Sequence, residues 1–544
     1  MSATSARLPV DIRRFPWINR LAADYAFDFA RLAEFYAGNP AEPAAWRDAI
    51  VRTQQYTRQR DAVAGVLAAQ QQHRGAPAEA AASAARLRDP RSVAVVTGQQ
   101  AGLFGGPLFT LLKAITTIRL AERVRLEHRV PAIPIFWIDS EDHDWAEVKS
   151  CGVLDAELNL LRIAVSDPPG ANERSVARTR LDDSARAAIE RLESTLPRTE
   201  FTPDLLTELR TVYRPGAGMA HAFGQWLETI LGSKGLVVFD AADPAAKPIV
   251  ASLFRQEIEH AGRTSALAGG AGAELAARGY RPQVTPYEGQ PALFHLDGGR
   301  EPVRQQDGVF TIGRQSFSRD ALFDLVTRTP QAFSPNVLLR PLVQDTLFPT
   351  VCYVAGPSEL AYLGQLRGVY AAFGLPMPLM QQRATATLLD ANSMRFLTRH
   401  DFAPEHLRAQ DEAALNQLLE AQLPASVEAS LEDAARVLVE RMEALAEAVP
   451  QIDPTLEGAA RSTLSRMQDD LKKLHGKIIQ AAKRKDETLR RQFRHARAQA
   501  FPDGHPQERT IGFVYFLNKY GPALVDRLSD ELTLEMGTHW ILTI

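Results

Sequence analysis

The sequence predicts an α/β protein with a parallel-sheet core, helical insertions and an antiparallel coiled-coil arm. Three observations lead to this fold class. Apolar, β-branched runs alternate with helical segments between residues 91 and 385, Gly or Pro follows several of these runs, and a heptad pattern occupies residues 431–481. Strands that are apolar on both faces and joined by helices are typical of an open, doubly wound parallel sheet.

The expected strands are short apolar runs. They lie at residues 92–96, 131–138, 235–240, 350–356 and 377–380. One helix is expected from Pro107 to Arg125, with Pro in its first turn, and another over 358–373, with Gly374 as its C-cap. The stretches 155–232, mostly helical in pattern, and 255–335, rich in Gly and Pro, are predicted to be insertions that wall a cleft.

The chain divides into four segments. Residues 1–90 are predicted to be a helical segment packing on the core, 91–385 the core with its insertions, 386–500 the arm, and 501–544 a segment returning to the core. Apolar residues at a and d spacing on both sides of Pro450–Pro454 predict a helical hairpin. Because an exposed apolar seam on such an arm commonly pairs with a second copy, we expect a homodimer.

Composition excludes several classes of protein. The net charge is −3, from 62 basic and 65 acidic residues, which argues against a protein that coats nucleic acid or anionic membrane. The basic residues between Lys483 and Arg497 have no interleaved aromatic residues, so they are interpreted as a solvated helix face. Two distant cysteines, no metal-binding spacing and no export signal or membrane-length apolar run predict a cytoplasmic protein.

The first candidate site is TGQQAGLFGGPLFTLLKA, residues 97–114, where a strand leads through a glycine-rich loop into a helix. Free amides and the helix dipole favour phosphate or carboxylate at such a helix start. The residues expected to let an anion approach the backbone are Gly98, Gly102, Gly105 and Gly106. Gln99 and Gln100 add neutral donors and acceptors. The alternative is a tight turn that only packs the helix on the sheet.

The second candidate site is WIDSEDHDWAEV, residues 137–148, after another strand. Such crowding of carboxylates is unfavourable unless a metal ion, an arginine or a substrate ammonium group lies among them, and we rank binding of an amine or water above a metal ion. Glu141 and Asp142 are expected to hold an ammonium group, and His143 to act as a general base. Together with Gln100 they form the predicted catalytic set. The alternative is a polar helix cap with solvated carboxylates.

The third candidate site surrounds the strand at 350–356, where Gly356 precedes another predicted helix start. Glu359 and Tyr362 on that helix could face the same cleft. Arginine offers a bidentate fork to carboxylate or phosphate. The residues predicted to bind substrate are Gln99, Arg340, Gln344, Glu359, Tyr362 and Arg383, and Gly356 joins the predicted anion-binding glycines. Each arginine alone could instead be a surface ion pair.

Four motifs together resemble one family. TGQQAGLFGGPLFTLLKA, FWIDSEDHDWAEV, RPLVQDTLFPTVCYVAGPSELAYLGQL and FPDGHPQERTIGFVYFLNKYG look like the bacillithiol biosynthesis cysteine-adding enzyme family, in the right order and across nearly the whole chain. The resemblance implies a Rossmann-like core akin to nucleotidyltransferases, with a coiled-coil dimerisation arm. Gln99-Gln100-Ala101-Gly102 stands where related folds carry an HxGH signature, so both histidines of that signature are missing.

The resemblance also implies an activity. It is amide formation between L-cysteine and the amine of glucosaminyl malate, the last step of bacillithiol biosynthesis. Such a ligase needs its carboxylate activated, so ATP or another nucleotide is expected as co-substrate, with no nucleic-acid or membrane partner. The residues leave two alternatives open: a non-catalytic nucleotide-binding scaffold whose arm pairs with partners, and a nucleotidyl- or glycosyltransferase with a similar core.

Overall fold

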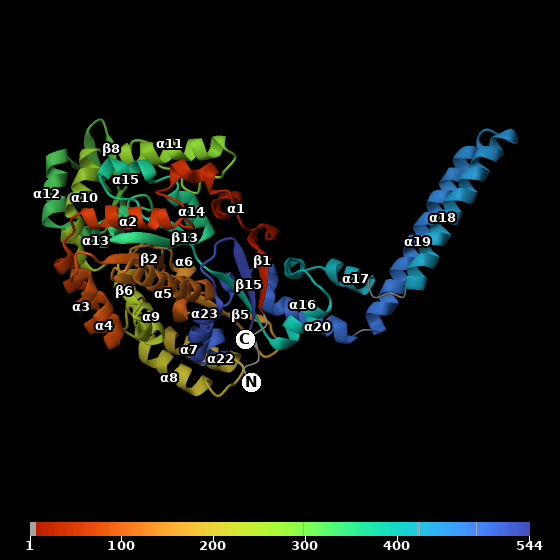
Figure 1. Cartoon of the computed structure of the whole chain (residues 1–544), viewed down its shortest axis with the longest axis horizontal. Helices are drawn as coiled ribbons and strands as arrows, with labels where there is room; N and C mark the ends of the chain where they lie inside the picture. The colour runs from red at the N-terminus through yellow and green to blue at the C-terminus, as the bar shows by residue number, and fades with distance from the viewer. Residues whose placement is uncertain (1–6, 298, 421–424, 486) are drawn as a thin grey trace. The chain divides into compact units, whose positions relative to one another are not determined.

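A computed structural model describes residues 7–297, 299–420, 425–485 and 487–544. The chain forms two compact units, which Figure 1 colours along the sequence. One consists of residues 7–387 together with 507–542, and the other is built on residues 388–506.

The core of the first unit is a five-stranded parallel sheet, as predicted from the apolar runs. Its strands, in the order β13-β12-β2-β3-β6, are β13 (Leu379–Gln382), β12 (Thr350–Ala355), β2 (Val93–Gln99), β3 (Ala132–Ile138) and β6 (Val237–Asp240). The chain runs outward from β2 through β3 to β6 and then crosses to β12 on the other side of β2. Ligands of doubly wound sheets bind at such a reversal, beyond the carboxyl ends of the strands.

Helices cover both faces of this sheet, which explains why its strands are apolar throughout. On one face, α2 (Pro43–Gln55) and α5 (Leu108–His128) pack against Val93, Val95 and Val351. On the other face, α3 (Arg60–Arg74), α10 (Lys247–Glu259) and α13 (Arg340–Leu347) contribute to the cluster that buries Val96 and Phe239. The remaining N-terminal helices of this unit are α1 (Arg20–Phe27) and α4 (Ala78–Ala85).

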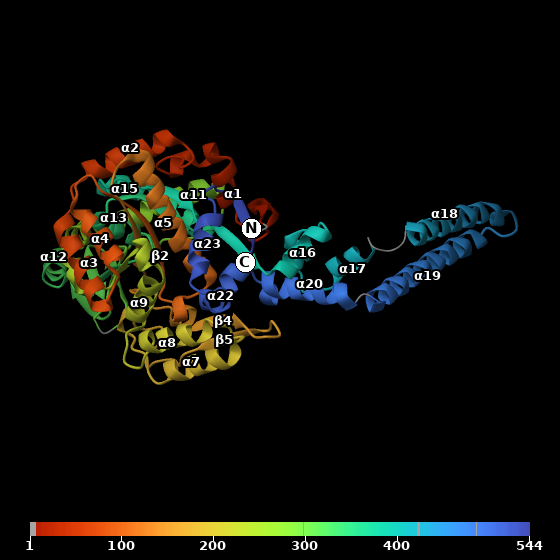
Figure 2. The same ribbon diagram turned by 60° about the horizontal axis from the view of Figure 1, so that its bottom comes forward.

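The two insertions contain more strand than their sequence pattern predicts. The first begins with the antiparallel hairpin β4 (Ser150–Leu154) and β5 (Leu160–Ala164), and then forms α7 (Ser184–Thr195), α8 (Thr202–Val212) and α9 (Met219–Leu231), as Figure 2 shows. The second carries α11 (Arg263–Ala277), α12 (Arg319–Arg328) and an antiparallel sheet. The strands of that sheet are β7 (Leu293–His295), β8 (Glu301–Gln306), β9 (Val309–Ile312), β10 (Gln315–Phe317) and β11 (Phe333–Pro335).

The single helix expected over residues 358–373 is wrong. The structure has two helices, α14 (Pro357–Leu363) and α15 (Arg367–Phe373). The break is held by Gln365, which is fully buried and whose side-chain amide donates to the carbonyl oxygens of Ala268, at 3.2 Å, and Val284, at 3.0 Å. A buried polar side chain with backbone partners in another segment outweighs the local preference to continue the helix.

The C-terminal residues 507–542 belong to the same unit as the sheet. They form α21 (Gln507–Thr510), α22 (Phe513–Tyr520), α23 (Ala523–Glu531) and most of β15 (Thr538–Thr543), which pairs antiparallel with β1 (Arg7–Asp11) in a small sheet that also holds β14 (Thr385–Leu389). The backbone of this segment contacts the start of α5, since the amide of Leu108 donates to the carbonyl oxygen of Ile511 at 2.8 Å.

The second unit is helical. It contains α16 (Ala391–Arg399), α17 (Ala413–Glu420), α18 (Ala425–Ala448), α19 (Leu456–Lys485) and α20 (Glu487–Ala500), with α18 and α19 side by side in Figures 1 and 2. Their pairing is the hairpin predicted from the heptads. Parts of its seam stay exposed: 48% of Leu445, 43% of Met467 and 49% of Leu474. The side chains of Lys483, Arg484 and Lys485 lie outside the described residues. Across the described ranges, no helix combines the length and apolarity that crossing a bilayer requires.

Candidate functional site

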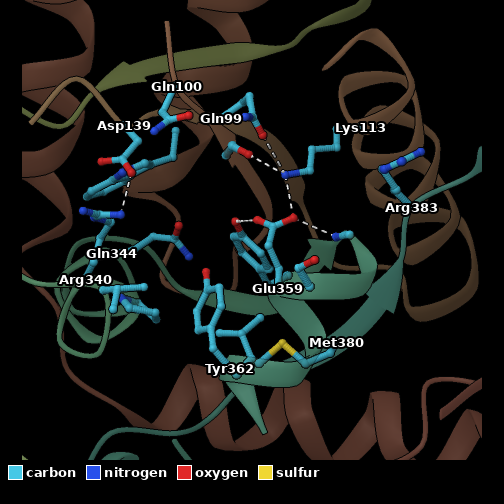
Figure 3. A pocket seen from close by; sticks show the side chains of 18 of the residues that line it. Gln99, Gln100, Lys113, Asp139, Arg340, Gln344, Glu359, Tyr362, Met380 and Arg383 are labelled. Atoms are coloured by element: carbon cyan, nitrogen blue, oxygen red, sulfur yellow. Dashed lines mark hydrogen bonds and ion pairs between the residues drawn. The ribbon is translucent and has the colours of Figure 1, made fainter. Parts of the chain in front are cut away.

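A cavity of about 370 Å³ lies at the carboxyl ends of β2, β3 and β12, where the strand order reverses. Figure 3 shows it from close by, with Asp139 and Arg340 on one side and Lys113 and Glu359 on the other. Its volume is in the range of small-molecule sites. Sequence-predicted residues that line it are Gly98, Gln99, Gln100, Asp142, Arg340, Gln344, Gly356, Glu359, Tyr362 and Arg383.

One side of the cavity is organised by the buried ammonium group of Lys113, on α5. Its Nζ donates to the carbonyl oxygen of Gly98 at 2.8 Å and to Oε1 of Gln99 at 3.2 Å, and it lies 2.6 Å from Oε2 of Glu359. Burial lowers the pKa of Lys113, because removal from water disfavours the charged form. All three of its N–H positions have acceptors, so Lys113 fixes the positions of Gln99 and Glu359.

Glu359 closes the start of α14 with its own side chain. Its Oε2 accepts the backbone N–H of Gly356 at 2.7 Å, and its Oε1 accepts the hydroxyl of Tyr353 at 2.8 Å. A carboxylate at this position satisfies an amide that the helix leaves free and interacts favourably with the helix dipole. Lys113 and Glu359 therefore form a closed network in which their two charges are paired with each other.

The opposite side of the cavity has buried polar atoms without hydrogen-bond partners. Arg340 donates from NH1 to Oδ2 of Asp139 at 2.5 Å. However, Nε of Arg340, Oδ1 of Asp139 and Nε1 of Trp137 are buried without a hydrogen-bond partner in the described structure. Burial raises the pKa of Asp139 to about 6, against the effect of Arg340. Buried polar atoms without partners are costly, and at the wall of a cavity they are the groups that a ligand can satisfy.

Gln100, Asp142 and His143 form a chain beside Asp139. Nε2 of Gln100 donates to Oδ2 of Asp142 at 2.6 Å, and Oδ1 of Asp142 accepts the backbone N–H of His143 at 2.7 Å. Burial opposes ionisation of Asp142, but the charge of Arg340 and these hydrogen bonds prevail and lower its pKa. Asp142 is thus an anion at neutral pH, and it lies on the same side of the cavity as the unpartnered atoms of Asp139 and Arg340.

Comparison with known proteins matches both parts of the chain. Residues 8–384 match the family model described as "Bacillithiol biosynthesis BshC, N-terminal Rossmann-like domain", and residues 386–544 match "Bacillithiol biosynthesis BshC, C-terminal coiled-coil domain". The chain belongs to the bacillithiol biosynthesis BshC family. The Rossmann-like core and coiled-coil region predicted from the sequence are therefore confirmed.

Relatives similar to this BshC family member cover it almost completely. A protein of Salinibacter ruber is 35% identical over 98% of both chains. A protein of Koribacter versatilis is 33% identical over 96% of this chain and 97% of its own, and one of Geobacillus thermodenitrificans is 32% identical over 97% and 98%. Each of the three carries the name "Putative cysteine ligase BshC".

Glu141 does not face the cavity, so its expected contact with an ammonium group of the substrate is wrong. Its side chain is 2% exposed and forms an ion pair with Lys247, the first residue of α10. A carboxylate beside both a lysine and a helix start is neutralised within the protein. Lys247 is 106 residues away along the chain, so no local pattern could indicate the pair.

His143 lies beside the cavity rather than in its wall, and 44% of its side chain is exposed. NH1 of Arg300, from the second insertion, is 3.2 Å from its Nδ1. The same Nδ1 is 3.1 Å from Oδ1 of Asp142, so it faces both a guanidinium group that only donates and a carboxylate that only accepts. These two contacts do not fix which ring nitrogen carries the proton, so the general-base role of His143 stays a prediction.

Gly102, Gly105 and Gly106 do not line this cavity, although Gly102 lines a second, adjoining one. Gly105 has φ +95°, and a Cβ at this position would lie 2.1 Å from the ring of Phe513. Gly106 has φ +78°, and its carbonyl oxygen accepts the amide of Phe513 at 3.2 Å. A Cβ at Gly102 would lie 2.8 Å from Cα of Gly106. The left-handed turn and the close approach of α22 explain these glycines.

Arg383 lines the cavity, but its fork is already occupied. Its NH1 and NH2 donate to the two carboxylate oxygens of Glu508, at 2.9 and 2.6 Å, and both side chains are buried. Burial opposes ionisation of Glu508, but Arg383 outweighs it and lowers the pKa of that carboxyl. The expected bidentate contact from Arg383 to a substrate is therefore not supported, because Glu508 takes that geometry.

The sequence did not single out Lys113 and Arg509 as lining residues, and it placed Asp139 in the second candidate site without a role. Lys113 had a signal, since a lone lysine in an otherwise apolar helix turn must find buried partners. Asp139 had one too, because it directly follows β3 at the end of the sheet where ligands bind. Arg509 had none, because it reaches the cavity from α21, more than 400 positions after the first lining residue, Gly98.

Proposed function

We propose that this protein is a ligase that joins the carboxyl group of L-cysteine to the amine of glucosaminyl malate, the amide-forming step that completes bacillithiol. The name shared by its relatives supports the reaction class. The observation that carries the proposal is that an anionic Asp142 and an Arg340 with an unpartnered Nε line one cavity at the switch point. An amine and carboxylates are the groups that the acceptor would bring.

We assign substrate contacts from charge. Arg340, with Gln344 beside it in the cavity wall, is assigned to the malyl carboxylates, because a buried guanidinium nitrogen without a partner favours an anionic oxygen. Asp142 is assigned to an ammonium group, and Gln100 positions Asp142 through their 2.6 Å hydrogen bond. Tyr362 offers its hydroxyl from the wall formed by α14.

Amide formation in water needs an activated carboxylate, and we propose that a nucleotide such as ATP supplies it. A cysteine carboxylate oxygen would bond to phosphorus and displace pyrophosphate or a nucleoside diphosphate. The amine nitrogen would then bond to the carbonyl carbon, the phosphate-bearing oxygen would leave with its electron pair, and the nitrogen would give up a proton.

We assign acceptance of that proton to Asp139 instead of His143. The Oδ1 atom of Asp139 is buried, unpartnered in the described structure and in the cavity wall. Its pKa of about 6 is close to neutrality, where a general base works best, since it is ionised yet still binds a proton appreciably.

A direct assay tests this function. Purified protein, L-cysteine, glucosaminyl malate and ATP are expected to yield a product with the mass of bacillithiol. Gln100→Ala and Asp142→Asn should lower its rate of formation, whereas Glu157→Gln, an exposed carboxylate next to the β4–β5 hairpin, should not. Absence of product with every common nucleoside triphosphate, with or without Mg²⁺, would contradict the proposal.

We also propose that the protein works as a homodimer through α18 and α19. The exposed Leu445, Met467 and Leu474 support this, because such a seam on a helical hairpin is covered by pairing with a second copy. Light scattering at micromolar concentration should give twice the chain mass, and Leu445→Glu with Leu474→Glu should give the single mass. A wild-type monomer would contradict it.

A further inference from the structure

A second cavity, of about 340 Å³, adjoins the substrate cavity. The two share Gln99, Gln100, Phe109, Glu147 and Arg509 as lining residues, so they adjoin at these side chains. The second cavity extends to Arg162 and Gly152 of the β4–β5 hairpin and to Gly512. All these residues belong to the same compact unit. The activity assigned above to the first cavity leaves the second without a role.

The second cavity carries excess positive charge. Arg162, on β5, and Arg509, on α21, both line it and are both exposed to it or to solvent. Neither guanidinium group has a hydrogen bond or ion pair with another residue of the described chain, apart from a ring contact of Arg509 with Phe109 at 5.8 Å. Glu147 is the acidic residue among its lining side chains, so two cations face one carboxylate.

The start of α5 faces the same cavity. Pro107 and Phe109, at the first turn of this 21-residue helix, line it. The amide of Leu108 is taken by Ile511, and that of Thr110 by Pro107 at 2.9 Å, but no residue in the described ranges accepts the amide N–H of Phe109. A free first-turn amide and the positive end of a helix dipole both favour an anion.

We infer that the second cavity binds an oxyanion, held by Arg162, Arg509 and the amide of Phe109. This inference rests on the proposed function, in which we assign the oxyanion to the phosphate chain of the activating nucleotide. Arginine forks together with a helix start match the charge and the several acceptor oxygens of such a chain. The malyl carboxylates offer the same chemistry and are the other possible source.

The residues shared by the two cavities place an anion in the second cavity close to the substrate in the first. Arg509 and Gln100 contact both cavities, so an anion in the second cavity lies beside the carboxylate that reacts in the first. Holding the phosphates there would stabilise the charge that accumulates on the leaving group when the carboxylate attacks. It would also keep the anionic chain away from Asp139 and Asp142.

Calorimetric titration with inorganic pyrophosphate and, separately, with L-malate tests the inference without turnover. The key variant is Arg162→Gln, which lines the second cavity and not the first. Its matched control is Arg191→Gln, an exposed arginine of α7 in the same insertion. Arg162→Lys, which keeps the charge without the fork, guards against a folding defect.

Arg162→Gln is expected to weaken pyrophosphate binding about tenfold, because it removes charge-assisted hydrogen bonds. Arg162→Lys should weaken it less, and Arg191→Gln should match wild type. If Arg162→Gln weakens malate binding instead, the oxyanion site stands and the acceptor is its source. If wild type binds neither anion, or if Arg162→Gln changes both dissociation constants less than twofold, the inference is wrong. Because binding is measured without product, a failed ligation assay would leave this result intact.

Discussion

The two sides of the substrate cavity differ in how far the protein satisfies its own polar groups. On the α14 side, Lys113 has three acceptors and Glu359 has three donors. On the β3 side, Asp139, Arg340 and Trp137 each retain a buried atom without a partner in the part of the chain that the structure describes. Both sides are dense in charge, yet Lys113 and Glu359 satisfy each other, whereas Asp139, Arg340 and Trp137 keep buried atoms for a ligand.

This difference teaches where to look for chemistry in such a cavity. A charge cluster that pairs internally positions the backbone, and its removal mainly costs stability. A cluster with unpartnered buried atoms keeps an energetic cost that a substrate relieves, and its removal mainly costs rate. Each substitution below therefore separates rate from stability.

The largest expected effect is that of Asp139→Asn on the rate of ligation. Removing a general base typically lowers the rate at least about a hundredfold. Wild-type kcat/KM should fall about tenfold per pH unit below pH 6, since the carboxyl, whose pKa is about 6, is protonated there. Asp139→Asn should lose this acid limb. Steady-state kinetics between pH 5 and 8 measure both quantities.

Two controls identify the group whose protonation causes the acid limb of the pH profile. Burial also raises the pKa of Asp345, in the same cavity, to about 6, so Asp345→Asn should retain the limb. Unfolding is not its cause either: the pKa of Asp139 is raised on folding, so its contribution to stability grows as the pH falls through 6 and is lost as the pH rises. An unchanged acid limb in Asp139→Asn would assign the base elsewhere.

Arg383→Met should cost the most stability. It leaves Glu508 as a buried charge without its bidentate partner, a change that typically costs about 3–5 kcal/mol. Urea unfolding followed by tryptophan fluorescence should show this loss, while Arg509→Met should stay within about 1 kcal/mol. Because the pKa of Glu508 is lowered on folding, the pair's contribution is present above pH about 4.3 and fades as acid protonates it. A loss of stability below about 1 kcal/mol would contradict this structural role and would favour substrate binding by Arg383.

Lys113→Met should destabilise the protein by about 1.5–3 kcal/mol, because it removes charged hydrogen bonds from Gly98, Gln99 and Glu359. The double variant Lys113→Met with Glu359→Gln should recover part of this loss, since it also removes the unneutralised carboxylate. The same urea titration measures both. If Lys113→Met is as stable as wild type but much slower, Lys113 takes part in the reaction and does not mainly stabilise the fold.

The smallest expected effect is that of Tyr362→Phe. Its hydroxyl points into the middle of the cavity in Figure 3. Loss of one neutral hydrogen bond to substrate should raise KM for glucosaminyl malate about three- to tenfold, with kcat and stability little changed. If KM stays at the wild-type value, the substrate does not reach this hydroxyl.

The sequence predicted the sheet and the position of the cavity because both follow from local patterns. Apolar runs such as AIPIFWI define buried strands, and residues directly after such strands meet at one edge of the sheet, as Gln100, Asp142 and Gly356 do. The heptads of α18 and α19 are equally local.

The failures involve partners that are distant in sequence. Arg383 and Glu508 are 125 positions apart, and the buried Gln365 splits α14 from α15 through bonds to Ala268 and Val284. Gly105 and Gly106 were assigned to a ligand because nothing near them in the sequence predicts that Phe513 packs on Gly105. Which charged residue is paired and which is free depends on such contacts.

The most direct test of the central claim is a crystal structure with glucosaminyl malate and L-cysteine bound. The account predicts that ligand atoms lie within hydrogen-bond distance of Oδ1 of Asp139 and Nε of Arg340, while the bonds of Lys113 to Gly98 and Glu359 remain intact. A ligand that replaces the partners of Lys113 or Glu359, or that binds outside this cavity, would contradict it.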